Sequence, residues 1–340
     1  MTKRAVLLVN LGSPDSTSIP DVRRYLNEFL SDDRVLDIAK PIQQFVLKCF
    51  ILPRRPKQSA HAYEQVWQPE GSPLMIISRQ VQTRLQEQVD LPIHLAMRYG
   101  SPSIPEVLTT IVDGGVEDLF LIPLYPHYAM SSYETVVARV HELVVEQHAG
   151  LKVTTQQPFY DHPDYIEALY QKTRPHLETG FDHLLFSYHG IPVRHLRKAD
   201  SSRCHCTKVP DCCTTSSPAH ATCYKAQCLR TTAALAERAG LSEDRYSVSF
   251  QSRLAGEPWL QPYTDHDLIR LGQAGCGRLL VITPAFVSDC LETLEEIAMA
   301  GRDSFLESGG GEFVHIPCLN DHPDWIRFLA SRVNEWNERA

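Results

Sequence analysis

His189 is the first residue of this sequence whose type and position suggest chemistry. It follows the apolar run His183–Tyr188, which predicts a buried strand, and precedes Gly190-Ile191-Pro192, which disfavours helix. Ligands of open α/β sheets bind at the carboxyl ends of strands, and an imidazole titrates near neutral pH, so His189 suits proton transfer or metal binding. A structural role is the alternative, since a lone histidine at a strand end carries no function by itself.

Glu292 and Glu296 form a second candidate group, in the segment Ser288–Glu296 that is predicted to open a helix at the same edge of a sheet. A spacing of four residues places both carboxylates on one helix face. Like charges at that spacing cost stability unless they are solvated or hold a cation or protons. A solvated acidic helix start, favoured by the helix dipole, is the alternative.

Cysteines form the third group, since six of the ten lie between Cys204 and Cys228. In a reducing compartment, such a concentration indicates a metal site rather than disulfides. Cys204, Cys206, Cys212 and Cys213 could hold a [2Fe–2S] cluster or tetrahedral zinc, with Cys223 as a substitute and His205 as a further candidate ligand. Because C-x-C…C-C is not a standard zinc-finger spacing, we favour the cluster; a loop without metal remains open.

Composition narrows the function classes further. Hydrophobic residues make up 43% and charged residues 22%, as in globular proteins, and the net charge of -8 argues against a nucleic-acid partner. The sequence shows no signal peptide and no run of about 18 apolar residues, so we expect a cytoplasmic protein. The apolar stretch 45–52, followed by basic residues, predicts a buried helix with a basic end rather than an interfacial lip, although a peripheral membrane contact stays open.

Short apolar runs alternate with segments of helical period, which predicts an α/β protein with parallel sheets. An internal sequence repeat suggests that one domain is a duplicate of the other: Glu134-Thr135 follows one predicted strand, and Glu292-Thr293 follows another in the second half. We expect helices at Ile19–Leu30 and Leu229–Arg238 and an amphipathic helix at the C-terminal end. The expected strands are Ala5–Asn10, Ile93–Arg98, Asp118–Leu124, Lys152–Gln156, His183–Tyr188, Tyr246–Gln251, Arg278–Thr283 and Glu312–Ile316.

Six motifs in order give the sequence a resemblance to the ferrochelatases, most closely to their proteobacterial, protoporphyrin-using branch. The motifs are Leu8-Val9-Asn10-Leu11-Gly12-Ser13-Pro14, Ala96-Met97-Arg98-Tyr99, Pro123-Leu124-Tyr125-Pro126, Ser187-Tyr188-His189-Gly190-Ile191-Pro192, Phe250-Gln251-Ser252-Arg253 with Pro258-Trp259-Leu260, and Ser288-Asp289-Cys290-Leu291-Glu292-Thr293-Leu294. Single motifs of this kind are weak, but six in order are specific.

The resemblance implies two Rossmann-like domains with parallel sheets, as in chelatases, and a porphyrin cleft between them. The expected domains are residues 1–160 with a lip segment and 161–322 with a cysteine-rich insertion at 199–228, followed by a closing helix at 323–340. The four cysteines at 204–213 are additions, because many relatives without a metal centre have a plain loop there. Some bacterial ferrochelatases carry a [2Fe–2S] cluster on internal cysteines.

The resemblance also assigns roles to residues. It implies that His189 and Glu292 are catalytic and that Asp289 and Glu296 continue an acidic path for iron. At the position of Cys290 some relatives have a histidine, so we expect a small buried residue there rather than a required ligand. The residues expected to bind the substrate are Leu11, Arg98, Tyr99, Trp259 and Phe286.

The implied activity is that of a lyase in haem biosynthesis, which inserts Fe²⁺ into protoporphyrin IX and releases two protons. Metal entry needs a bent macrocycle and two deprotonations, which would suit an apolar clamp, an imidazole and a carboxylate pair. The alternatives are the same reaction on coproporphyrin and a non-catalytic iron–sulfur or porphyrin-binding sensor on the same scaffold. Chelatases for cobalt or nickel are typically shorter and lack the Gln251-Ser252-Arg253 segment.

Overall fold

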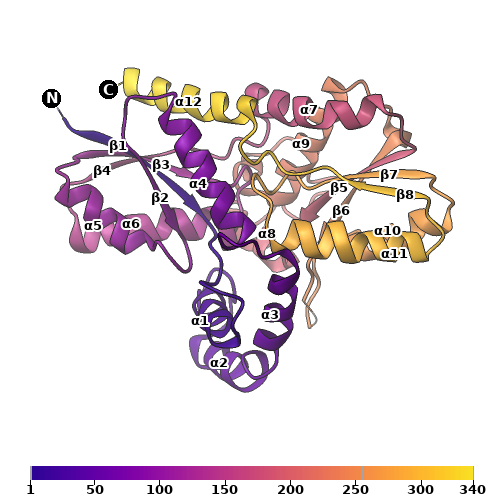
Figure 1. Ribbon diagram of the computed structural model, residues 1–340, viewed down its shortest axis with the longest axis horizontal. Coiled ribbons are helices and arrows are strands. Elements are labelled where there is room, and N and C mark those ends of the chain that lie inside the picture. The colour runs from indigo at the N-terminus through magenta and orange to yellow at the C-terminus, as the bar shows by residue number, and fades with distance from the viewer. Residues whose placement is uncertain (1, 255, 340) are drawn as a thin grey trace. The chain divides into compact units, whose positions relative to one another are not determined.

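Two four-stranded parallel sheets organise the chain in the computed structural model, which describes residues 2–254 and 256–339 (Figure 1). Each sheet belongs to its own compact unit. Unit 1 comprises residues 2–124, 130–157 and 326–339, and unit 2 comprises residues 125–129 and 158–325. The last helix therefore starts in unit 2 and continues in unit 1, and the segment 125–129 belongs to unit 2.

The sheet of unit 1 has the strand order β2-β1-β3-β4, with all neighbours parallel. All six residues of β3 are buried, as expected for a strand covered on both faces. The predicted strands agree with the observed ones to within one residue at each end. The strands are β1 (Arg4–Asn10), β2 (Ile93–Met97), β3 (Asp118–Pro123) and β4 (Lys152–Thr155).

Some helices of unit 1 begin at a serine that caps the first turn with its side chain. Ser18 and Ser72 accept hydrogen bonds from backbone N–H groups of the first turn, and Ser103 forms a capping box with Glu106. The helices are α1 (Ile19–Leu30), α2 (Lys40–Val46), the π-helix η1 (Leu47–Ile51), α3 (Arg55–Val66), α4 (Pro73–Gln86), α5 (Ile104–Asp113), the π-helix η2 (Met130–Glu134), α6 (Thr135–Gln147) and α12 (Pro323–Glu338), which continues from unit 2.

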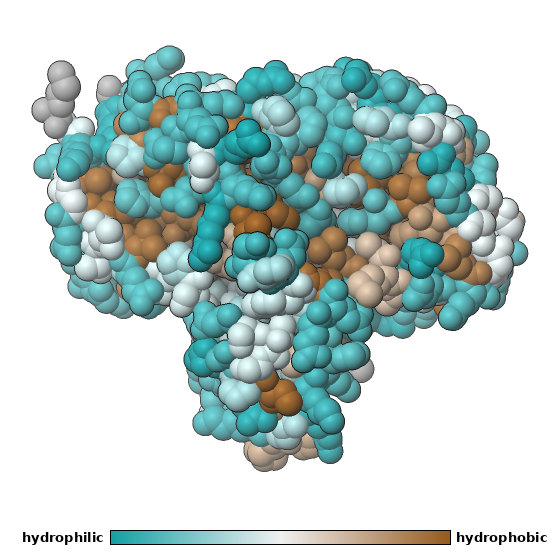
Figure 2. Space-filling view, viewed as in Figure 1, coloured by the Kyte–Doolittle hydropathy of each residue, from teal (hydrophilic) through white to brown (hydrophobic). Residues whose placement is uncertain are grey.

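The segment from α1 to α3 projects from the sheet of unit 1, and its end is apolar (Figures 1 and 2). Ile42, Phe45 and Phe50 are 57%, 59% and 54% exposed, and the two phenylalanine rings lie 5.7 Å apart. The prediction of a buried helix at 45–52 was therefore wrong: the segment is helical, but the side chains of Phe45 and Phe50 are more than half exposed. Among the described residues, no helix is both long and apolar enough to cross a membrane.

The sheet of unit 2 has the order β6-β5-β7-β8, again all parallel, so it repeats the strand order of the first sheet. In Figure 1, α7 and α9 cover one face of this sheet, and α10 and α11 cover the other. The strands are β5 (His183–His189), β6 (Tyr246–Gln251), β7 (Arg278–Ile282) and β8 (Glu312–His315). The helices are α7 (Pro163–Glu178), α8 (Val193–Ala199), the 3₁₀ helices η3 (Pro218–Thr222) and η4 (Glu243–Arg245), α9 (Tyr224–Arg238), α10 (Thr264–Gln273), the π-helix η5 (Glu292–Gly301) and α11 (Arg302–Glu307).

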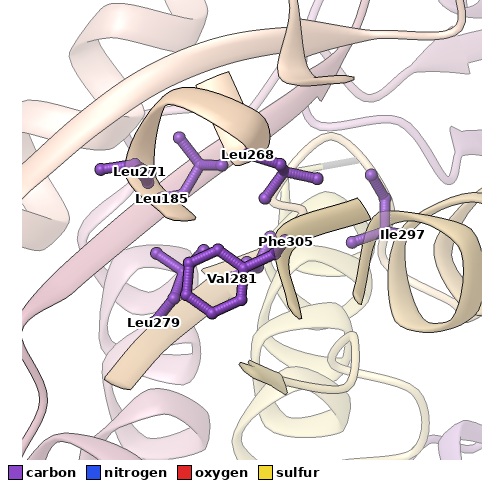
Figure 3. Packing of buried hydrophobic residues seen from close by; sticks show 7 residues of the cluster. All are labelled: Leu185, Leu268, Leu271, Leu279, Val281, Ile297 and Phe305. Carbon is purple, nitrogen blue, oxygen red and sulfur yellow. The ribbon is translucent and has the colours of Figure 1, made fainter. Parts of the chain in front are cut away.

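One core cluster of unit 2 fixes the helix that carries the acidic pair (Figure 3). Ile297 of η5 and Phe305 of α11 pack with leucines and a valine from β5, β7 and α10, and every member is at most 7% exposed. Burial of an aliphatic side chain of this size contributes about 1.5–3 kcal/mol. Because Ile297 directly follows Glu296, this packing determines where the carboxylates of η5 lie.

Candidate active site

His189 is the last residue of β5, so its imidazole lies at the carboxyl end of the sheet of unit 2. Its Nδ1 lies 2.6 Å from the carbonyl oxygen of Gly190. A carbonyl oxygen only accepts hydrogen bonds, so Nδ1 carries the proton in this geometry and Nε2 has the free lone pair. The imidazole can therefore accept a proton, or bind a metal, through Nε2.

Glu292 and Glu296 both lie on η5, which is a π-helix rather than the predicted α-helix. Isolated π-helical turns occur frequently at functional sites. Burial is the largest effect on Glu296 and raises its pKa, and the charge of Glu292 adds to that rise, while a hydrogen bond from Ser252 and the charge of His189 oppose it. Glu292, Glu296 and His189 therefore lie close enough to influence one another.

Gln251 and Ser252, which the sequence prediction did not include as site residues, hold this group together. Gln251 Nε2 donates to the carbonyl oxygen of Glu292 at 3.0 Å and to the carboxylate of Glu296 at 3.3 Å, and the Ser252 hydroxyl also donates to that carboxylate. The Gln251 side chain is in turn fixed by a hydrogen bond from Ser187, at 2.8 Å. Their position at the end of β6 was the available signal, because β5 and β6 end at the same sheet edge.

Ser252 adopts a positive φ of 65°, a conformation uncommon for residues other than glycine. Such conformations persist where the surrounding structure holds them, and they cluster at functional sites. Here the turn directs the serine hydroxyl to the carboxylate of Glu296.

Aromatic side chains lie beside His189, as the resemblance implies. The ring of Phe286 is 6.2 Å from the imidazole in an edge-to-face arrangement. Trp259 is 8% exposed and lies against Gly190, where a Cβ atom would come within 3.3 Å of the indole. Its indole Nε1 is buried and has no hydrogen-bond partner among the described residues. Gly190 thus leaves room for the indole next to the catalytic candidate.

The carboxylate of Asp289, which the resemblance places on an acidic path, is held by hydrogen bonds within unit 2. Both of its carboxylate oxygens accept hydrogen bonds, one from the hydroxyl of Thr293 at 2.9 Å and the other from the amide of Asn320 at 2.7 Å. The neighbouring Cys290 is buried, as expected, and burial raises the pKa of its thiol well above the usual value. Asp289 therefore joins the start of η5 to the segment after β8.

The substrate-binding candidates of unit 1 lie at the ends of β1 and β2. Leu11 is half-buried, and its carbonyl oxygen accepts the N–H of Tyr99 at 2.9 Å. Arg98 forms an ion pair with Asp32, and the Tyr99 hydroxyl donates to the same carboxylate at 2.9 Å. The structure thus gives Arg98 a counter-charge and Tyr99 a hydrogen-bond acceptor inside unit 1, where the sequence predicted contacts with a substrate.

The cysteine-rich segment of unit 2 brings four thiols near one another, but they include Cys223, the predicted substitute, in place of Cys204. Cys206 and Cys223 are buried and Cys212 and Cys213 half-buried, whereas Cys204 is exposed. Hydrogen bonds from the thiols of Cys206 and Cys213 lower the pKa of Cys223, and the same contacts raise the pKa of the two donors. The charge of Cys212 raises both donors further, so these four side chains lie near one another.

Within residues 2–254 and 256–339, no group of three or more histidine, cysteine, aspartate or glutamate side chains is already arranged around a metal position. The chemistry of the donor set nevertheless fits a thiolate-bound centre, since the shared thiols of Cys206, Cys213 and Cys223 stabilise a thiolate, the form that binds metal. The presence of a [2Fe–2S] cluster stays a prediction.

Comparisons with known proteins agree on the fold and the family. The structure of SirB from Bacillus subtilis with Fe³⁺ matches with a TM-score of 0.55 at 12% identity, covering 98% of this chain and 95% of that one, which supports the chelatase-like fold. The ferrochelatase of Opitutus terrae is 61% identical over 99% of this chain and 98% of its own length, and that of Stutzerimonas stutzeri is 51% identical over 97% of each. The ferrochelatase family model matches residues 3–336. This chain therefore belongs to the ferrochelatase family.

Proposed function

We propose that this chain, a lyase of the family that inserts metal into porphyrin, acts on Fe²⁺ and protoporphyrin IX to form protohaem. Membership of the family supports the reaction. The observation that carries the residue roles is the group at one sheet edge: an imidazole with a free Nε2 beside a carboxylate whose pKa is raised.

The reaction requires that two pyrrole N–H groups each lose a proton as Fe²⁺ binds the four ring nitrogens. In the proposed mechanism, His189 Nε2 accepts a pyrrole proton, because Nδ1 already donates to Gly190. Burial raises the pKa of Glu296 and so favours its protonated form, which allows this carboxyl group to take up and relay the proton that the imidazole receives. Glu292, half-buried and beside Glu296, supplies a second carboxylate for the proton or the cation.

Phe286 and Trp259 would provide apolar surface against the macrocycle next to His189. Asp289 would hold the start of the acidic path in place, because its carboxylate accepts hydrogen bonds from Thr293 and Asn320. Arg98 and Tyr99 would act by supporting the loop that carries Leu11, through their shared contact with Asp32, rather than by binding propionates.

The test is anaerobic incubation with Fe²⁺ and protoporphyrin IX, followed through the absorption bands of porphyrin and haem. We expect turnover by the wild type, none by His189→Ala and a strong loss in Glu292→Gln. Glu134→Gln is a matched control, because Glu134 has the equivalent position in unit 1 and pairs with Arg34 at 3.4 Å. If the wild type turns over coproporphyrin but not protoporphyrin IX, coproporphyrin is the substrate. If a folded wild type turns over neither porphyrin, the sensor alternative is favoured.

We also propose that Cys206, Cys212, Cys213 and Cys223 hold a metal centre, with Cys223 in place of the exposed Cys204. A [2Fe–2S] cluster would supply redox chemistry there, and zinc would supply structural cross-linking. Cys223→Ser should lose the metal, whereas Cys204→Ser should keep it. Equal iron and acid-labile sulfide with a visible absorption spectrum would identify the cluster, zinc alone would identify the other centre, and no metal would refute the proposal.

The apolar end of the α1–α3 projection supports a peripheral membrane contact. Phe45 and Phe50 are exposed beside Lys48, Arg54 and Arg55, a combination that binds anionic lipid surfaces. Binding to vesicles that contain an anionic phospholipid should weaken strongly in the double variant Phe45→Ser/Phe50→Ser. The control is Val145→Ser, which removes an apolar side chain 78% exposed on α6 of the same unit. Equal binding by both variants would refute the contact.

A further inference from the structure

Tyr224 connects the cysteine-rich segment to the catalytic candidate His189. It is the first residue of α9 and directly follows Cys223, which caps that helix. Its side chain is 5% exposed, and its hydroxyl donates to the backbone carbonyl oxygen of His189 at 2.9 Å. A proposed metal ligand, Cys223, is therefore the direct neighbour in sequence of the residue that hydrogen-bonds to the backbone of His189.

The two ends of the cysteine-rich segment are joined at its base. The hydroxyl of Thr222 donates to the carbonyl oxygen of Ala199 at 2.6 Å. Ala199 ends α8, which begins four residues after His189. This hydrogen bond thus joins the two ends of the segment. One end follows His189 closely in the sequence, and the other end directly precedes Cys223 and Tyr224.

The interior of the segment is ordered by hydrogen bonds around the thiols. One carboxylate oxygen of Asp200 accepts the backbone N–H groups of His205 and Cys206 at 2.9 and 2.8 Å. The Nε2 atoms of His205 and His220 lie 2.7 and 2.8 Å from the carbonyl oxygen of Cys212. A change at the thiols therefore acts on a connected structure that ends at Tyr224.

The backbone at His189 has two further attachments. The N–H of Gly190 donates to the carbonyl oxygen of Gln251 at 2.7 Å, and the imidazole Nδ1 bonds to the carbonyl of Gly190. With the hydroxyl of Tyr224 on the His189 carbonyl, this peptide is held from α9 and from β6. Loss of one attachment should loosen the imidazole without removing any group that touches the porphyrin.

We infer that Tyr224 is a positioning residue that holds the backbone of His189 and makes the position of this imidazole depend on the state of the cysteine centre. The inference rests on the metal centre proposed above. It predicts that an occupied centre and an intact Tyr224 hydroxyl act on His189 together, so that either change has an effect and the two changes combined add little.

Histidine modification by diethyl pyrocarbonate measures this dependence without relying on activity. Mass spectrometry can compare labelling of His189 with labelling of His183, which lies at the other end of β5 and serves as an internal reference. The proteins compared are the wild type, Tyr224→Phe and Tyr133→Phe, each as purified and after treatment with a chelator. Tyr133→Phe is the matched control, since it removes a hydroxyl that donates to the carbonyl of Gln156 at 2.8 Å in unit 1.

We expect metal removal to accelerate His189 labelling about two- to tenfold in the wild type and in Tyr133→Phe, as loss of one buried hydrogen bond would. Tyr224→Phe should label this fast already and respond little to the chelator. Its kcat should fall about two- to tenfold with the KM for porphyrin unchanged, since Tyr224 does not contact substrate. Thr222→Val, which opens the base of the segment, should reduce the response in the same way.

A chelator response in Tyr224→Phe equal to that of the wild type would overturn the inference, as would a wild type whose His189 ignores metal removal. Metal analysis of the same samples separates these results from a failure of the centre itself. If no metal is found and Cys223→Ser labels like the wild type, the centre and the inference fall together. If metal is bound and His189→Ala is inactive, but the labelling of His189 does not respond to metal removal, only the inference on Tyr224 is refuted.

Discussion

Gln251→Glu tests the contact between residue 251 and Glu296, on which the proposed proton relay depends. In the wild type, Gln251 Nε2 donates to the Glu296 carboxylate at 3.3 Å and to the Glu292 carbonyl at 3.0 Å. The substitution keeps the shape of the side chain but replaces this donor with an oxygen of a second carboxylate. Because Gln251 is only 3% exposed, water can do little to separate the two charges.

The magnitude follows from the distance. Two unit charges 3.3 Å apart repel by about 5 kcal/mol at an effective dielectric constant of about 20. The native pair should therefore retain one proton, while the unfolded chain ionises both carboxyls near their ordinary pKa of about 4.3. A native state that binds the extra proton loses stability as pH rises, by up to about 1.4 kcal/mol per pH unit, until the repulsion limits the loss.

Urea unfolding at pH 5, 6, 7 and 8 measures this loss. Gln251→Met is the control, because it removes the hydrogen bonds without adding charge and should cost about 1–3 kcal/mol at every pH. The deficit of Gln251→Glu relative to the wild type should instead grow as the pH rises past the raised pKa of wild-type Glu296, because below that pH both native proteins hold one proton. A deficit that stays constant with pH would show that residue 251 does not face the Glu296 carboxylate, and the proposed relay would lose its geometry.

Three further predictions concern buried side chains that can gain or lose a proton. Glu296→Gln should stabilise the protein more at pH 8 than at pH 4, because burial raises the pKa of Glu296 and the wild type loses stability as the pH rises through that value; urea unfolding at both pH values checks this. Asp32→Asn should cost about 3 kcal/mol at pH 7, because it leaves Arg98 without its counter-charge. Burial raises the pKa of Asp32, but its hydrogen bonds and Arg98 lower it more, so the cost should shrink as unfolding is measured at pH values falling below 3.8. Burial lowers the pKa of His127 to about 3, so the wild type should lose about 2 kcal/mol between pH 7.5 and 5, and His127→Gln less, by thermal unfolding.

The strands were predictable because both faces of each sheet are covered. A strand such as β3 needs an apolar or otherwise buried residue at every position, which gives a continuous run that ends at Pro123. The segment 45–52 was not predictable in the same way. Its composition favours burial, but the helix lies on a projection, where the side chains of Phe45 and Phe50 are more than half exposed.

The site was only partly predictable, because sequence spacing does not show which carboxylates already have partners. The sheet-edge rule brought His189 and Glu296 together, and the structure agrees. It could not show that Asp289 bonds to Asn320, which lies 31 positions further along the chain. Nor could it show that Arg98 pairs with Asp32, 66 positions earlier. Contacts between such distant residues follow from the folded topology and not from local pattern.

The two units repeat one arrangement of strands, and the proposed chemistry uses the copy in unit 2. Both sheets have the same strand order, and a π-helix follows the third strand of each, with Glu134 in η2 equivalent to Glu292 in η5. In unit 1 the glutamate pairs with Arg34, whose guanidinium is permanently charged. In unit 2 the acidic pair faces His189 and the uncharged Gln251 instead, so burial can raise the pKa of Glu296. A carboxylate whose pKa is raised needs partners that do not fix its negative charge, and of these two described glutamate sites the one in unit 2 has them.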